Sequence, residues 1–245
     1  MPRPLIDHLW REHADAQLGQ RRGPTPRHST GDVITHAVRL ADTGGLGAVT
    51  VRALADSLNI KTMSVYTHVN SREDLLVLMA DEVHKHMEMP AFGRSNWRTR
   101  VRRLAEANLA LLRTHSWMLE IEDPRLALGP GTIAKYDHEL HAFDETGLDD
   151  LARDAALTFV LDFARASAAR LASTPRGDFS EVWAESVGQL ANYLGDEYPL
   201  AQRVGQVAGE NMGGPYDASR AWDWGLDRVL SGLAELIEHD SAGDR

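Results

Sequence analysis

Apolar residues recur every three or four positions through most of this chain, and no segment sustains the alternation of apolar and polar residues that a β-strand needs. The clearest stripe is Leu75, Met79, Val83 and Met87, at a constant spacing of four. Such spacing places side chains on one face of an α-helix, whereas strand faces repeat with a period of two. The sequence therefore predicts an all-α fold without a sheet.

Gly, Pro and capping residues divide the chain into helical segments. Ser29 with Asp32 resembles a capping box, Thr50 and Ser71 are candidate N-caps, and Asn59 can adopt the left-handed conformation of a tight turn. We expect helices over residues 5–18, 29–43, 50–58, 62–68, from 71 onward, and over 95–115, 130–146, 148–173, 179–194, 199–208 and 217–238.

The composition is that of a globular protein. The chain has 245 residues, 43% of them apolar, which is enough for one large or two modest domains. No run of about eighteen apolar residues occurs, and the N-terminus lacks a secretory pattern, so we expect no membrane span. Cys is absent, which excludes disulfides and thiol chemistry and fits the reducing cytoplasm as the location of the protein.

Charge is distributed unevenly along the chain. Residues 1–90 contain 10 Lys and Arg against 11 Asp and Glu, whereas residues 91–245 contain 16 against 25. Phosphate groups would be repelled by the second part, so a nucleic-acid partner would meet the first third of the chain. We expect an N-terminal extension with a basic linker over 1–28, a domain over 29–90, and a second domain over 91–245.

The segment 62–68 is unusually polar for a helix packed in a core. It presents Thr, Ser, His and Tyr side chains, with Met63 and Val65 as its apolar members. Three short helices with a tight turn between the second and the third form the helix-turn-helix arrangement. A helix that enters the major groove of DNA needs short donors and acceptors, and apolar groups that meet thymine methyls. The polarity of this segment therefore indicates DNA contact.

The stretch "LGAVTVRALADSLNIKTMSVYTHVNSREDLLVLMADEV", Leu46 to Val83, closely resembles the DNA-binding domain of the tetracycline-repressor (TetR) family. The matching features include a capping Thr at 50, an Arg at 52, the pairs Val65-Tyr66 and His68-Val69, and a basic residue at 72. With the preceding helix, this resemblance covers about residues 29–83. The segments "WRTRVRRLAEANLALLRTHSW", "GLDDLARDAALTFVLDFARA" and "WDWGLDRVLSGL" resemble, more loosely, the C-terminal regulatory domain of such regulators.

The resemblance implies a homodimer in which the last long helices form the interface and a small effector enters the C-terminal domain. We interpret the chain as a ligand-responsive repressor that binds a pseudo-palindromic operator. One alternative is a ligand-independent regulator whose C-terminal domain serves dimerisation or a protein partner. Another is a helical-bundle enzyme with an appended helix-turn-helix, which the lack of a nucleophile–base set argues against.

The predicted DNA-binding residues lie between the second and fourth helices of the first domain. Val65 and Val69 are expected to pack inside it. Arg52 is a candidate for guanine contact, and Tyr66, His68 and Arg72 suit phosphate contacts. The full predicted set is Thr50, Arg52, Lys61, Thr62, Met63, Ser64, Tyr66, Thr67, His68 and Arg72.

An effector pocket is expected among the C-terminal helices. Aromatic and Met side chains around a polar His suit a small apolar or aromatic ligand, although each residue taken singly fits an ordinary core as well. The candidates are Met87, Leu112, His115, Trp117, Met118, Tyr136, Phe143, Phe159, Phe163 and Trp183. No cofactor is required, and the pairs His84/Glu88 and His138/His141 offer only two ligands each, too few for a metal site.

Two further features of the sequence each allow two interpretations. The segments 148–173 and 217–238 carry wide apolar surfaces, which fit either the core of one domain or pairing with a second copy. The basic linker with Arg21, Arg22 and Arg27 either lies along DNA or is a solvated tail.

Overall fold

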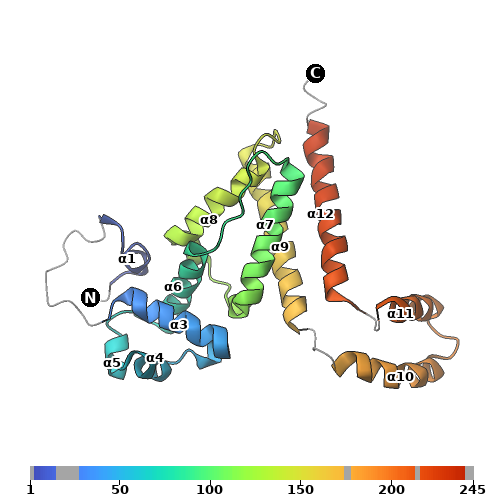
Figure 1. Ribbon diagram of the computed structural model, residues 1–245, viewed down its shortest axis with the longest axis horizontal. Coiled ribbons are helices and arrows are strands. Elements are labelled where there is room, and N and C mark those ends of the chain that lie inside the picture. The colour runs from blue at the N-terminus through green and yellow to red at the C-terminus, as the bar shows by residue number, and fades with distance from the viewer. Residues whose placement is uncertain (1–2, 15–27, 174–177, 213–215, 241–245) are drawn as a thin grey trace.

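The computed structural model describes residues 3–14, 28–173, 178–212 and 216–240. Every regular element in these ranges is a helix, which confirms the predicted all-α fold (Figure 1). No helix in the described part of the chain combines the length and the apolar character needed to cross a membrane.

The helix-turn-helix domain occupies one end of the molecule (Figure 1). Ser29, Thr50 and Ser71 each accept a hydrogen bond from the backbone N–H three residues on, as N-caps do, and Asn59 adopts a positive φ of 53° in the tight turn. The predicted starts of three helices are thereby confirmed. The elements are α3 (Thr30–Gly44), η1 (Leu46–Ala48), α4 (Val51–Leu58), α5 (Thr62–Val65) and α6 (Arg72–Lys85).

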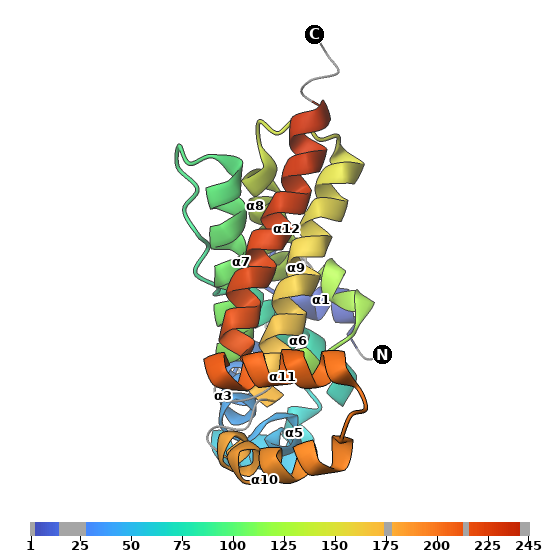
Figure 2. The same cartoon turned by 90° about the vertical axis from the view of Figure 1, so that its right-hand side faces the viewer.

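Of the remaining helices, α7, α9 and α12 run side by side as a bundle (Figure 2), and α10 and α11 lie beside one end of this bundle (Figure 1). Val101, Leu157 and Leu226, one from each of the three long helices, are completely or almost completely buried between them. The elements are α7 (Trp97–Thr114), η2 (Ser116–Glu120), η3 (Pro124–Leu128), α8 (Pro130–Leu140), η4 (His141–Phe143), α9 (Asp150–Ser173), α10 (Asp178–Leu194), α11 (Pro199–Met212) and α12 (Ala218–Asp240).

Apolar packing joins the two halves of the protein. The core of the helix-turn-helix domain continues into Trp117, Met118 and Ile121, which belong to η2 and the residue after it. Helix α6 also packs along α8 over much of its length. Buried side chains therefore cross the boundary between the two halves.

Several predicted helices differ from the observed ones at their ends. Helix α5 ends at Val65 and is followed by a turn over residues 66–68, because the segment has only Val65 and Val69 to bury. The segment expected as one helix over 130–146 is α8 followed by the 3-10 turn η4. Helix α11 is longer than expected and ends at Met212.

The N-terminal extension is docked against the body. The predicted helix 5–18 is only α1 (Leu5–Leu9) plus a turn, and the part from 15 onward lies outside the described residues, as does the basic linker. Leu9 is buried, the indole N–H of Trp10 donates to the carbonyl of Leu128 at 2.9 Å, and Arg11 pairs with Glu82 at 2.6 Å. This segment therefore contacts both α6, through Glu82, and the end of η3, through Leu128.

Candidate DNA-binding face and effector groove

The helix-turn-helix exposes the side chains that the sequence singled out. Val65 and Val69 are buried and anchor α5, as predicted. Met63 is 74% exposed and Tyr66 is 51% exposed, so both side chains are accessible to a partner molecule. Lys61, Thr62, Thr67 and Arg52 are also exposed, and Ser64 is half-buried.

Four residues of the predicted face also have side-chain partners within the domain. The hydroxyl of Thr67 donates to the carbonyl of Ser64 at 2.7 Å. Thr50 accepts from the N–H of Ala53, and Arg72 donates to the carbonyl of Leu46 at 3.0 Å while remaining exposed. His68 is half-buried, with Nδ1 3.3 Å from Thr30 Oγ1. Burial, and then the neighbouring His28, lower the pKa of His68, so at neutral pH it offers phosphate a hydrogen bond and no charge. The roles of the ten residues toward DNA stay predictions.

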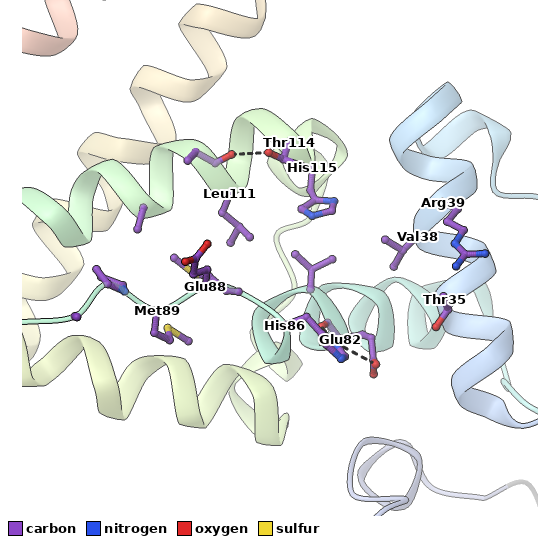
Figure 3. Close-up of a pocket in the computed structure, with 16 residues that line it drawn as sticks. Thr35, Val38, Arg39, Glu82, His86, Glu88, Met89, Leu111, Thr114 and His115 are labelled. Carbon is purple, nitrogen blue, oxygen red and sulfur yellow. Dashed lines mark hydrogen bonds and ion pairs between the residues drawn. The ribbon is translucent and has the colours of Figure 1, made fainter.

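A groove of about 820 Å³ opens where the helix-turn-helix domain meets the bundle (Figure 3). One wall is α3, with Thr35, Val38 and Arg39, and the opposite walls are the end of α6 and the face of α7. The floor follows the segment 86–91. The groove combines apolar lining with ionisable groups, as small-molecule sites do. Its complete lining is Thr35, Val38, Arg39, Glu82, Val83, His86, Met87, Glu88, Met89, Pro90, Ala91, Ala107, Ala110, Leu111, Thr114 and His115.

Polar contacts tie the end of this groove to the DNA-binding domain. His115, which lines the groove, donates from Nδ1 to Asp42 Oδ1 at 2.7 Å. Trp117 donates its indole N–H to the same oxygen at 2.7 Å. Asp42 belongs to α3, so two side chains of the bundle hold the first helix of the DNA-binding domain.

The structure brings together only two of the ten predicted effector residues, Met87 and His115, which both line the groove. Trp183 lines a separate hollow between α10 and α11, and Phe163 stacks on Trp222. Tyr136 and Phe159 are exposed, while Leu112, Trp117, Met118 and Phe143 pack in the two cores. The prediction had counted aromatic and Met residues, whereas burial in a core and lining of a cavity differ only in the tertiary arrangement.

A buried ionic cluster, which the sequence did not reveal, lies deeper in the bundle. Lys135 Nζ lies 2.7 Å from both carboxylate oxygens of Glu139, and Asn108 donates to Glu139 Oε1 at 2.6 Å. The side chains of Lys135 and Glu139 are only 8% and 1% exposed. Burial lowers the pKa of Lys135, and the charge of Glu139 opposes this shift. The spacing of four between a Lys and a Glu was visible, but such pairs are usually on solvated faces.

The His pairs considered as metal ligands have other partners. His84 Nδ1 contacts Thr132 Oγ1, His138 Nε2 contacts the carbonyl of Pro90, and His141 Nδ1 contacts Asp144 Oδ2. Within the described residues no group of three His, Asp or Glu side chains is arranged to hold a metal ion.

The outer surfaces of α9 and α12 carry a few large apolar side chains among polar ones. Leu226 of α12 is completely buried, but Trp224 is 68% exposed, and Phe159 of α9 is 53% exposed. The two helices lie next to each other on the same side of the bundle (Figure 2). The core interpretation of these segments is confirmed for one face of each helix, whereas pairing with a second copy stays a prediction.

A helix-turn-helix domain joined to a helical bundle defines a DNA-binding regulator in which one chain combines reading head and regulatory domain. A family model described as "Tetracyclin repressor-like, C-terminal domain" matches residues 89–237. The chain belongs to the tetracycline-repressor (TetR) family of transcriptional regulators. It is a DNA-binding regulator and not an enzyme, and it acts on operator DNA as a homodimer.

A curated relative agrees with this assignment, and solved structures share the fold. The HTH-type transcriptional repressor DrrR1 of Streptomyces coeruleorubidus is 30% identical over 240 residues, which cover 95% of this chain and 85% of the relative. The crystal structure of apo ActR from Streptomyces coelicolor shares 23% identity, covers 88% of this chain and 99% of its own, and has a TM-score of 0.72. ActR in complex with actinorhodin shares 24% identity over 87% of this chain and 99% of its own, with a TM-score of 0.70.

Proposed function

We propose that this protein is a repressor that releases its operator when a small apolar or aromatic molecule occupies the groove between α3, α6 and α7. Each subunit of the homodimer places one α5 in the major groove of a half-site of a pseudo-palindromic operator. The observation that carries the proposal is that the walls of the groove come from both the DNA-binding domain and the bundle.

The position of the groove suggests how binding is coupled to release. An occupant between α3 and α7 contacts both domains, and a molecule that engages His115 competes with the bond to Asp42 that holds α3. A ligand shifts a two-state equilibrium only when it binds the states with different affinity. Because the width of this groove depends on where α3 lies, ligand affinity differs between the two arrangements of the reading heads.

The lining favours an uncharged organic effector with a few polar groups. Val83, Met87 and Leu111 supply apolar contact, and His86, Glu88 and Arg39 supply donors and acceptors around it. A volume of about 820 Å³ accommodates a molecule of several fused rings. The complexes of ActR with actinorhodin and with (S)-DNPA support an effector in this size range.

We assign the dimer contact to the exposed faces of α9 and α12. Trp224 and Phe159 would lose their water contact when the two helices pair with the same helices of a second copy around a twofold axis. Isologous four-helix interfaces of this kind bury apolar groups that a monomer leaves in solvent.

The predicted DNA face is tested by a matched pair of variants. Lys61→Ala should weaken binding to every DNA sequence alike and lower the slope of log K against log salt by about one, because a phosphate contact is lost. Thr62→Val should leave that slope unchanged and alter the preferred half-site, since a base contact is lost. Salt titrations and in vitro selection distinguish the two. An unchanged motif for the Thr62 variant would contradict base reading by this residue.

The groove is tested with an occlusion variant. A thermal-shift screen of aromatic compounds, combined with release from selected operator DNA, identifies binders of the wild-type protein. Ala110→Trp places an indole in the groove, so the compounds should raise the melting temperature less, and they should release DNA from this variant at least tenfold less effectively than from the wild type.

Arg113→Trp is the control, because Arg113 is exposed on the same helix and lies outside the groove. Its response to the compounds should equal that of the wild type. If the Ala110 variant responds to the compounds as well as the wild type does, the groove is not the effector site. If no compound shifts melting or releases DNA, the result supports the alternative of a ligand-independent regulator.

A further inference from the structure

A second cavity, of about 340 Å³, lies between the N-terminal segment, α6 and the beginning of α8. It shares Glu82 and Met89 with the effector groove, but its other walls differ. Leu9, Trp10, Pro130 and Ala134 form its apolar part. The N-terminal segment, which the sequence analysis treated as an extension, therefore builds a site.

One wall of this cavity is an aromatic side chain held in place. Trp10 bonds to the carbonyl of Leu128 at 2.9 Å through its indole N–H. The ring is thereby anchored to the end of η3, in the cavity that the start of α8 also lines. An anchored aromatic surface binds a flat ring at a low cost in conformational entropy.

A chain of hydrogen bonds sets the tautomer of His84, which lines the same cavity. The backbone N–H of Thr132 donates to Asp81 Oδ1 at 2.8 Å, and the hydroxyl of Thr132 donates to the same oxygen at 3.0 Å. Because this hydroxyl has given its hydrogen to Asp81, it accepts at its oxygen from Nδ1–H of His84, 2.9 Å away. The proton of the neutral imidazole is therefore on Nδ1, and Nε2 carries a lone pair.

The imidazole remains neutral under ordinary conditions. Burial, and then the positive charge of Lys135, lower the pKa of His84 to about 3. Among the described residues Nε2 of His84 has no hydrogen-bond partner. It is also not one of the fully buried, unpartnered side-chain polar atoms, so it is accessible to solvent. It is consequently an unused acceptor on a residue that lines the cavity.

Four charged side chains that line the cavity pair with one another. Arg11 pairs with Glu82, and Lys85 pairs with Glu12, each at 2.6 Å. An ionic ligand would meet charges that are already compensated and would lose its hydration. A neutral ligand with an apolar body and one hydroxyl donor matches the available contacts.

We propose that the cavity between the N-terminal segment, α6 and α8 is a second small-molecule site, which binds a neutral aromatic alcohol through a hydrogen bond to Nε2 of His84 and stacking on Trp10. The volume is near the lower end of small-molecule sites, so the ligand has one or two rings. Apart from Glu82 and Met89, the lining of this site differs from that of the proposed effector groove.

The test uses two probes of similar shape, of which only one carries a hydroxyl hydrogen that can be donated. Calorimetric titration of the full-length protein at pH 7 with 2-naphthol should give an affinity about tenfold higher than with 2-methoxynaphthalene, because only the first can donate to Nε2. His84→Phe retains a ring but removes the acceptor, so the two probes should then bind equally. Equal affinity of both probes for the wild-type protein would overturn the proposal.

Occlusion variants keep the test independent of the folding of the His84 variant. Ala134 is exposed at the cavity wall, and Ala134→Trp should abolish the binding of 2-naphthol. Ile133→Trp changes an exposed neighbour outside the cavity and should leave the binding unchanged. Ala110→Trp, which fills the effector groove, should also leave it unchanged. Loss of 2-naphthol binding in the Ala110 variant but not in the Ala134 variant would refute this site and leave the effector groove standing.

Discussion

Replacing Lys135 by Met should destabilise the protein by about 3–5 kcal/mol, because the substitution leaves the carboxylate of Glu139 buried without its counter-charge. Lys135 Nζ contacts both oxygens of that carboxylate at 2.7 Å, and the one other side chain that bonds to it within the described part of the chain is Asn108. Asn108 is neutral and cannot replace the lost charge. Urea denaturation at a fixed protein concentration measures the effect, since the chain is a dimer.

The double variant Lys135→Met with Glu139→Leu is the control for this prediction. It removes both charges and keeps an apolar volume, and it should recover most of the lost stability, because a buried ion pair often contributes little net free energy. Asn108 retains its bond to the carbonyl of Leu104. A single variant that loses less than about 1 kcal/mol would show that water reaches Glu139 and that the cluster is not buried as described.

Replacing Gly131 by Ala should lower the stability by roughly 2–3 kcal/mol and weaken operator binding, because α8 touches the backbone of α6 at this residue. A Cβ on Gly131 would lie 2.3 Å from the carbonyl oxygen of Asp81 and 2.8 Å from the backbone nitrogen of Lys85. These are backbone atoms, so the two helices must separate. Since α6 is part of the DNA-binding domain, the separation moves the reading head relative to the bundle.

Gly47→Ala is the matched control, since a Cβ at this exposed glycine of η1 meets nothing within 4 Å. Its stability and operator affinity should stay within about 0.5 kcal/mol of the wild-type values. Thermal melting and operator titration measure both variants. If the Gly131 variant behaves like the Gly47 variant, then the close contact between α6 and α8 does not position the reading head.

Local signals predicted much of the fold correctly. Ser29, Thr50 and Ser71 cap the helices that they were expected to cap, and Asn59 makes the left-handed turn between α4 and α5. Capping depends on atoms within three or four residues, so a single sequence carries this information. The end of α5 at Val65 was not predicted, because a short helix is continued or ended by its tertiary contacts as much as by its own residues.

The contacts between distant segments could not be predicted in the same way. The sequence listed Met87 and His115 among ten candidates without distinguishing them from Trp117 or Phe143, which are buried in cores. The N-terminal segment gave no sign that Trp10 would reach Leu128, over a hundred residues away. Periodicity reports which face of a helix is apolar, but not which other helix covers that face.

The sequence by itself determined the helical class, the helix-turn-helix and the polar surface of the recognition segment, because spacing, caps and side-chain types act over a few residues. Only the tertiary structure decided where a small molecule can enter. The effector groove exists because α3 stands away from α7 while Asp42 is held by His115, and the second cavity exists because α1 folds back onto α6. Both depend on packing between segments far apart in the chain, where the geometry of whole helices outweighs the preference of any single residue.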